Sequence, residues 1–97
     1  MYTTTIKTST GHSMYVRAVA RGMIPADCKY IEDFTKFYIV TNWDRDGSVF
    51  FYVASGNTSA PEQICVWYPK NKRMWSSYGK TIKAAVEGAI SDGWMYA

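Results

Sequence analysis

The chain has 97 residues, a formal net charge of +3 at pH 7 and 47% hydrophobic residues. This length permits one compact domain, residues 1–97, and excludes a second. The high apolar fraction and the small net charge exclude intrinsic disorder.

The composition favours strands over helices. The chain contains four Trp, eight Tyr and four Phe but not one Leu. Leu is a strong helix former, whereas aromatic and β-branched residues suit the half-buried surfaces of a sheet. We therefore expect an α+β fold built mainly on an antiparallel sheet of about four to six strands.

The N-terminal third contains one clear strand and one ambiguous segment. Residues 2–8 alternate as a first strand, but residues 13–22 fit two periods. One helical face would collect Tyr15, Val16, Val19, Ala20 and Met23, whereas Val16, Ala18 and Ala20 could alternate in a strand. We favour a short helix over 13–22, and either structure projects Arg17 and Arg21 from the same side.

The middle of the chain predicts a hairpin with two apolar faces. Residues 24–27 break the chain, and residues 28–34 weakly suit a strand. Residues 37–43 and 48–54 then flank a turn at 44–47 that contains a glycine. Apolar side chains occur at both odd and even positions of the two strands. Both faces of this hairpin therefore require cover.

The C-terminal part predicts two strands and an amphipathic helix. Residues 63–68 and 73–77 read as a second hairpin. The helix, over 80–92, has apolar residues at i, i+3, i+4, i+7 and i+8, with Thr81 as its N-cap and Gly93 as its stop. Glu87 is placed to pair with Lys83 one turn earlier.

No motif of catalysis or metal binding is present. Cys28 and Cys65 are far apart, without a C-x-x-C pair, so we expect two reduced, buried thiols and no metal or cofactor. His12 is the only histidine, and the carboxylates show no paired spacing, so we expect a protein that is not an enzyme. A secretory signal and a membrane-spanning run are missing, which favours a soluble, cytoplasmic protein that does not bind membranes.

The positive charge is concentrated between residues 63 and 86. This stretch has five basic residues and no acidic one, interleaved with aromatic rings. Cations attract phosphate and aromatic faces stack on bases, as single-stranded nucleic acids and nucleotides require. A second interpretation stays open, in which residues 70–73 form a solvated turn and the rings belong to the core.

The start of the C-terminal helix offers a phosphate contact. Gly79-Lys80-Thr81 resembles the end of a phosphate-binding loop, but that loop requires Gly at position 74, where this chain has Met74. A nucleotide triphosphatase loop is excluded. A simpler phosphate contact at the helix start remains.

Size, the missing targeting signal, the α+β plan and the terminal helix from Ser77-Tyr78-Gly79-Lys80-Thr81 to Gly93-Trp94 resemble small bacteriophage-encoded counter-defence proteins. The resemblance is in kind, carries no specific motif and assigns no residue. It implies action in the host cell cytoplasm, either as a sponge for a nucleotide messenger or as an inhibitor of a host defence protein or nucleoprotein complex.

The positive charge favours the sponge, because inhibitors that mimic DNA need negative charge. We therefore predict a binding protein for an anionic nucleotide-type ligand, with a single-stranded nucleic-acid-binding module and the defence inhibitor as alternatives. A homo-oligomer is expected from the doubly apolar hairpin and the Trp94 tail. The candidate ligand-binding residues are Arg17, Arg21, Trp67, Lys70, Lys72, Arg73, Trp75, Tyr78, Lys80 and Thr81.

Overall fold

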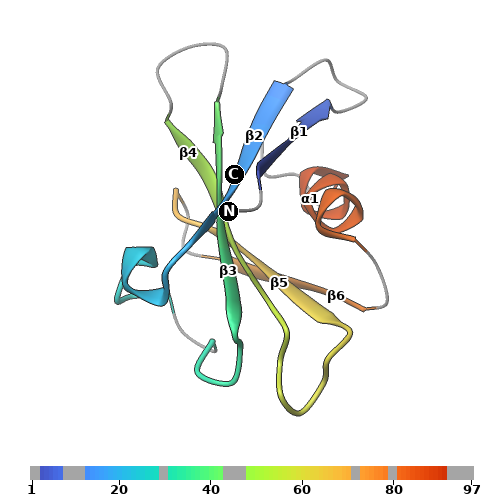
Figure 1. Ribbon diagram of the computed structural model, residues 1–97. Coiled ribbons are helices and arrows are strands. Elements are labelled where there is room, and N and C mark those ends of the chain that lie inside the picture. Colours follow the sequence, from blue (N-terminus) through green and yellow to red (C-terminus); the bar gives the residue numbers. More distant parts are fainter. Residues whose placement is uncertain are drawn as a thin grey trace.

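The computed structural model describes residues 3–7, 13–28, 31–42, 48–70, 73–78 and 81–91. Six antiparallel strands follow one another in chain order across a single sheet, and one helix packs beside it (Figure 1). The elements are β1 (Thr3–Lys7), β2 (Ser13–Val19), β3 (Lys36–Asn42), β4 (Val49–Ser55), β5 (Gln63–Tyr68), β6 (Arg73–Tyr78) and α1 (Ile82–Ser91). This arrangement confirms the α+β fold with a mainly antiparallel sheet and a C-terminal helix.

The helix favoured for residues 13–22 is wrong. Residues 13–19 form the interior strand β2, which pairs with β1 and β3, and only Arg21–Met23 form a short 3-10 turn. Met14 and Val16 are fully buried on one side of β2, as the period of two requires. The backbone N–H and C=O groups of this segment form hydrogen bonds with the two neighbouring strands. In a helix these groups would bond to one another and could not pair with the sheet.

One face of the sheet packs against α1. Its core joins side chains of β2 to β5 with the small-residue stripe Ala85, Val86 and Ala89 of the helix, all of which are fully buried. Ile82 and Ile90 extend the same stripe at its two ends. The helical periodicity of residues 80–92 is therefore confirmed, with α1 occupying 82–91. Among the described residues no helix is long and apolar enough to span a bilayer.

The opposite face is covered by the connection between β2 and β3, residues 20–35, of which 29 and 30 are outside the description. This β2–β3 connection places Cys28, Ile31 and Phe34 over Phe37 and Trp67 in a second buried cluster. The strand expected at 28–34 is not formed at its described positions, 28 and 31–34. Short turns bend the chain instead, with Cys28 N–H donating to the Pro25 carbonyl at 3.0 Å and Phe34 N–H to that of Ile31 at 3.1 Å.

The alternation of β4 and β5 explains why both faces need cover. In β5, Ile64 and Val66 belong to the cluster under α1, whereas Cys65 and Trp67 belong to the cluster under the β2–β3 connection. The chain thus supplies its own cover for the hairpin of β3 and β4. The Trp94 tail, the second argument for a homo-oligomer, lies outside the described residues, as does the expected turn at 44–47.

Candidate functional site

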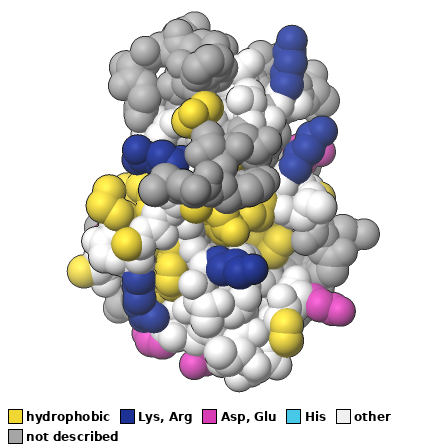
Figure 2. Space-filling model, in the orientation of Figure 1, with side chains coloured by type: hydrophobic (Ala, Val, Ile, Leu, Met, Phe, Trp, Pro, Cys, Tyr) yellow, Lys and Arg dark blue, Asp and Glu magenta, His cyan; other side chains and the backbone are white. Residues whose placement is uncertain are grey.

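The predicted cationic residues that the structure describes do not form one patch. Arg17 lies in β2 and Arg21 directly after it, whereas Lys70 and Arg73 lie at the turn between β5 and β6. Strands β3 and β4 separate β2 from β5 in the sheet. On the face shown in Figure 2, the Lys and Arg side chains occupy separate places rather than one cluster.

Trp67 is removed from the set of stacking residues. Its side chain is only 4% exposed, and its ring lies 5.7 Å from that of Tyr52 in the cluster beneath the β2–β3 connection. The alternation of β5 puts it on the inner side of that cover together with Cys65. Such a ring cannot stack on a ligand base without opening the core.

Two of the predicted arginines are engaged within the chain. The guanidinium of Arg21 donates a hydrogen bond from Nη1 to the Glu32 carbonyl at 3.2 Å and lies 5.7 Å from the centre of the Phe37 ring. The Arg73 guanidinium lies 5.3 Å from the centre of the Tyr68 ring. The Arg21 contacts link the β2–β3 connection to β3, and the Arg73 contact lies across the pair of β5 and β6, so phosphate binding would compete with both.

The remaining candidates divide into two groups. Arg17 and Lys70 are exposed, and Arg17 borders a shallow hollow beside Met23. Residues Lys72 and Lys80 and the side chains of Trp75 and Tyr78 lie outside the description.

Thr81 lines an open groove of about 400 Å³ where α1 begins. We call this the α1 groove; its lining residues are Lys36, Ser55, Gly56, Pro61, Glu62, Ile64, Thr81 and Ile82. The sheet register explains why these distant residues meet. Lys36 pairs with Ser55 where β3 begins and β4 ends, and Gln63 at the start of β5 pairs with Tyr78 at the end of β6. The same end of the sheet therefore receives the start of α1.

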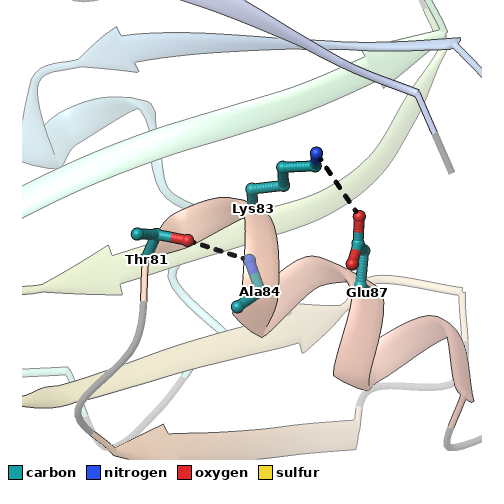
Figure 3. A network of polar contacts seen from close by, with 4 residues as sticks. All are labelled: Thr81, Lys83, Ala84 and Glu87. Atoms are coloured by element: carbon teal, nitrogen blue, oxygen red, sulfur yellow. Dashed lines mark hydrogen bonds and ion pairs between the residues drawn. The ribbon is translucent and has the colours of Figure 1, made fainter.

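The helix side of the α1 groove has the predicted N-cap. The Thr81 hydroxyl accepts a hydrogen bond from Ala84 N–H at 3.2 Å, and the Lys83 ammonium lies 4.0 Å from the Glu87 carboxylate (Figure 3). Both contacts confirm the sequence prediction. The N–H groups of Ile82 and Lys83 have no acceptor inside the helix, since they belong to its first turn. They are the donors that an anion at a helix start uses.

The loop side of the α1 groove is held by local hydrogen bonds. The Asn57 side-chain oxygen accepts from Ser59 N–H at 2.8 Å and from Ala60 N–H at 3.2 Å, while its amide donates to Gln63 at 3.2 Å. Thr58 N–H donates to the Asp33 carbonyl at 2.9 Å, which ties the loop to the β2–β3 connection. The groove is therefore preformed.

The lining of the α1 groove combines opposite charges with an apolar floor. Lys36 and Glu62 are exposed, and neither forms an ion pair within 4.0 Å with another described residue. Pro61, Ile64 and Ile82 supply the apolar surface. Its volume falls in the usual range for small-molecule sites, which pair apolar walls with a few polar groups. Among the described residues, no three His, Cys, Asp or Glu side chains lie together as a metal site would require.

Sequence reasoning found Thr81 but missed Lys36, Ser55 and Glu62. No local pattern marks them, because they become neighbours only through the register of β3, β4 and β5. Comparison with known proteins produced no matching family model, curated protein or solved structure.

Proposed function

We propose that this protein binds a small phosphorylated molecule of nucleotide type in the α1 groove and holds it without converting it. The supporting observation is the meeting of three features in one preformed space. These are the first turn of α1 behind Thr81, the charge of Lys36, and the apolar surface of Ile64 and Ile82. Phosphate, ribose and base each find a matching part of this lining.

The chemistry divides along the groove. The phosphate takes the first-turn N–H groups of α1 and the Lys36 ammonium, since both favour an anion. The base rests on the apolar side chains of Pro61 and Ile82. The Glu62 carboxylate accepts hydrogen bonds from ribose hydroxyls, as acidic residues do in dinucleotide sites. The carboxylate would also disfavour a ligand that is anionic along its whole length.

Sequestration is the activity that follows from such a site. Among the lining residues, the hydroxyl residues Ser55 and Thr81 have no histidine beside them, and the one carboxylate, Glu62, is assigned to the ribose hydroxyls. A cytoplasmic sponge of the counter-defence kind, which the sequence resembles, would act in this way by lowering the free concentration of a nucleotide signal.

Ligand screening tests the proposal directly. The melting temperature is measured with adenosine monophosphate, ADP-ribose and a cyclic dinucleotide, with adenosine as the control that lacks phosphate. We expect one or more phosphorylated compounds to raise the melting temperature, adenosine to have little effect, and the bound compound to be recovered intact after denaturation. No shift with any of them would contradict the proposal, and recovery of a cleaved product would indicate an enzyme.

Matched charge variants locate the site. Lys36→Gln should weaken binding of the active compound about tenfold by calorimetry, since a charged contact to phosphate is lost. Lys7→Gln removes an equal charge from an exposed position in β1 and should leave the dissociation constant unchanged. If Lys70→Gln weakens binding while Lys36→Gln does not, the ligand binds at the β5–β6 turn. Binding of oligothymidylate with a steep salt dependence would instead favour the nucleic-acid module.

A further inference from the structure

The two cysteines of the chain meet in one buried cluster. Cys28 belongs to the β2–β3 connection and Cys65 to the interior strand β5, and they are 7% and 4% exposed. Both line the same small space under the connection, together with Phe37, Ala54 and Trp67. The two residues are not joined by a disulfide in the structure. Their segments are far apart in sequence and come together only through the packing of the connection on the sheet.

The surroundings of the two thiols favour contact between them over contact with solvent. The space that they line has no room for a water molecule. Ala54 pairs with Cys65 across β4 and β5, so the neighbouring position on the same face carries only a methyl group. Burial raises the pKa of the Cys28 thiol to about 11, with further contributions from the charges of Asp27 and of the Cys65 thiolate. The two side chains thus share one water-free space within the same cluster.

We propose that Cys28 and Cys65 are a latent disulfide site, oxidised by glutathione disulfide to a bond that fastens the β2–β3 connection to β5. A thiolate of one cysteine attacks glutathione disulfide, breaks its S–S bond and releases one glutathione thiolate. The second cysteine attacks the mixed disulfide, forms the Cys28–Cys65 bond and releases the second glutathione. The two thiol protons end on the two glutathione molecules, so two protein thiols are oxidised and one disulfide is reduced.

Local opening of the connection controls this reaction. Glutathione cannot reach sulfur atoms enclosed by the second cluster, so the Phe34 side of the connection must first leave the sheet. Among the described residues, the hydrogen bonds that hold it there include Arg21 to the Glu32 carbonyl, the N–H and hydroxyl of Thr35 to the Ser55 and Gly56 carbonyls, and Thr58 N–H to the Asp33 carbonyl. The native protein therefore reacts slowly, and the oxidised protein holds its connection closed.

Oxidative refolding tests the site without requiring glutathione to reach the two sulfur atoms in the folded protein. The reduced, unfolded chain is refolded with reduced and oxidised glutathione, and its mass is then measured under non-reducing conditions. We expect most molecules to lose about 2 Da and take up no glutathione, because folding brings the two thiols together. A peptide map should join the segments that contain Cys28 and Cys65. The melting temperature should rise by roughly 10 °C over the reduced protein. Two mixed disulfides with glutathione, two thiols that stay reduced, or a disulfide-linked dimer would each overturn the proposal.

The single variants Cys28→Ser and Cys65→Ser provide the matched controls. Each has one thiol, so each should end as a thiol or a mixed disulfide and show no rise in melting temperature under the same conditions. In native wild-type protein, a sub-denaturing concentration of urea should speed disulfide formation severalfold, since it populates the open connection. An equal rate with and without urea would contradict control by opening.

Discussion

The hydroxyl of Tyr68 in β5 donates a hydrogen bond to the backbone carbonyl of Ala89 in α1, with 3.1 Å between the two oxygens. Both residues are buried. The Tyr68 ring also contacts the Arg73 guanidinium and the Phe51 ring, whose centre lies 5.6 Å from its own. One phenol therefore joins the helix, the central strands and the β5–β6 turn. It is a buried polar contact between α1 and the sheet.

Removing this hydroxyl should destabilise the protein measurably. Tyr68→Phe keeps the ring but deprives the Ala89 carbonyl of a buried donor, which costs about 1 to 2 kcal/mol of unfolding free energy. Urea denaturation followed by circular dichroism measures the loss. Tyr52→Phe is the matched control, because the Tyr52 hydroxyl forms no hydrogen bond with the described residues and its loss should cost less than about 0.5 kcal/mol. Equal costs for the two variants would contradict the role given to the Tyr68 contact.

The two arginines near β2 should differ in their effect on stability. Arg21→Ala removes a hydrogen bond to Glu32 and a cation–π contact with Phe37, and should cost about 1 kcal/mol. It should also raise the hydrogen-exchange rates of residues 24–34, since that segment loses one of its attachments. Arg17→Ala removes an exposed side chain and should change stability by less than about 0.5 kcal/mol. Unaltered exchange in the Arg21 variant would show that the connection is held by its apolar side chains alone.

Much of the fold could be predicted because its elements have clear local signals. The strands at 37–43, 48–54 and 63–68 are runs rich in aromatic and β-branched residues, and the terminal helix has an apolar stripe at helical spacing. Residues 13–22 carry apolar side chains that satisfy both periods, so their structure depends on pairing with β1 and β3, which no local pattern reveals. Residues 28–34 have the composition of a strand but serve as buried anchors of a turning connection.

The site could be predicted only in part, for the same reason. Adjacency in sequence suggested that Trp67 lies beside Lys70 on the surface, but strand alternation turns the indole toward the second cluster. Thr81 was found because N-caps have a local signal. Lys36 and Glu62 line the same groove as Thr81 only after three strands and a helix have been assembled. Such neighbours are properties of the tertiary structure.

Gly56 should be the most sensitive position on the lining of the α1 groove. Its φ of 69° is in the left-handed region, and an added Cβ would lie 2.5 Å from the Thr35 hydroxyl oxygen. That hydroxyl cannot easily move, because it donates to the Gly56 carbonyl at 3.0 Å. Gly56→Ala should therefore cost about 1 to 3 kcal/mol. Gly22→Ala is the control, since a Cβ there meets no atom within 4 Å, and its cost should stay below about 0.5 kcal/mol.

Stability should fall in alkaline solution because of Cys28. Its thiol has a pKa of about 11 in the folded chain against 9.0 for the ordinary group, chiefly because burial disfavours the thiolate. Above pH 9 the unfolded chain releases this proton while the folded chain retains it, so the unfolded state is stabilised relative to the native state. The contribution of the protonated Cys28 thiol to the free energy of unfolding is complete below pH 9 and is lost as the pH rises through about 11. The loss amounts to on the order of 2 kcal/mol.

Urea denaturation under reducing conditions at about pH 8 and about pH 11 measures this effect. Lysine and tyrosine side chains also titrate in this range, so the informative quantity is the difference between wild type and Cys28→Ala. The variant should be less stable at the lower pH, because a buried side chain is truncated, but should lose less stability between the two values. An identical loss in both proteins would mean that the Cys28 thiol ionises in the folded chain as readily as in the unfolded one. In that case water reaches the second cluster, and the β2–β3 connection does not seal it.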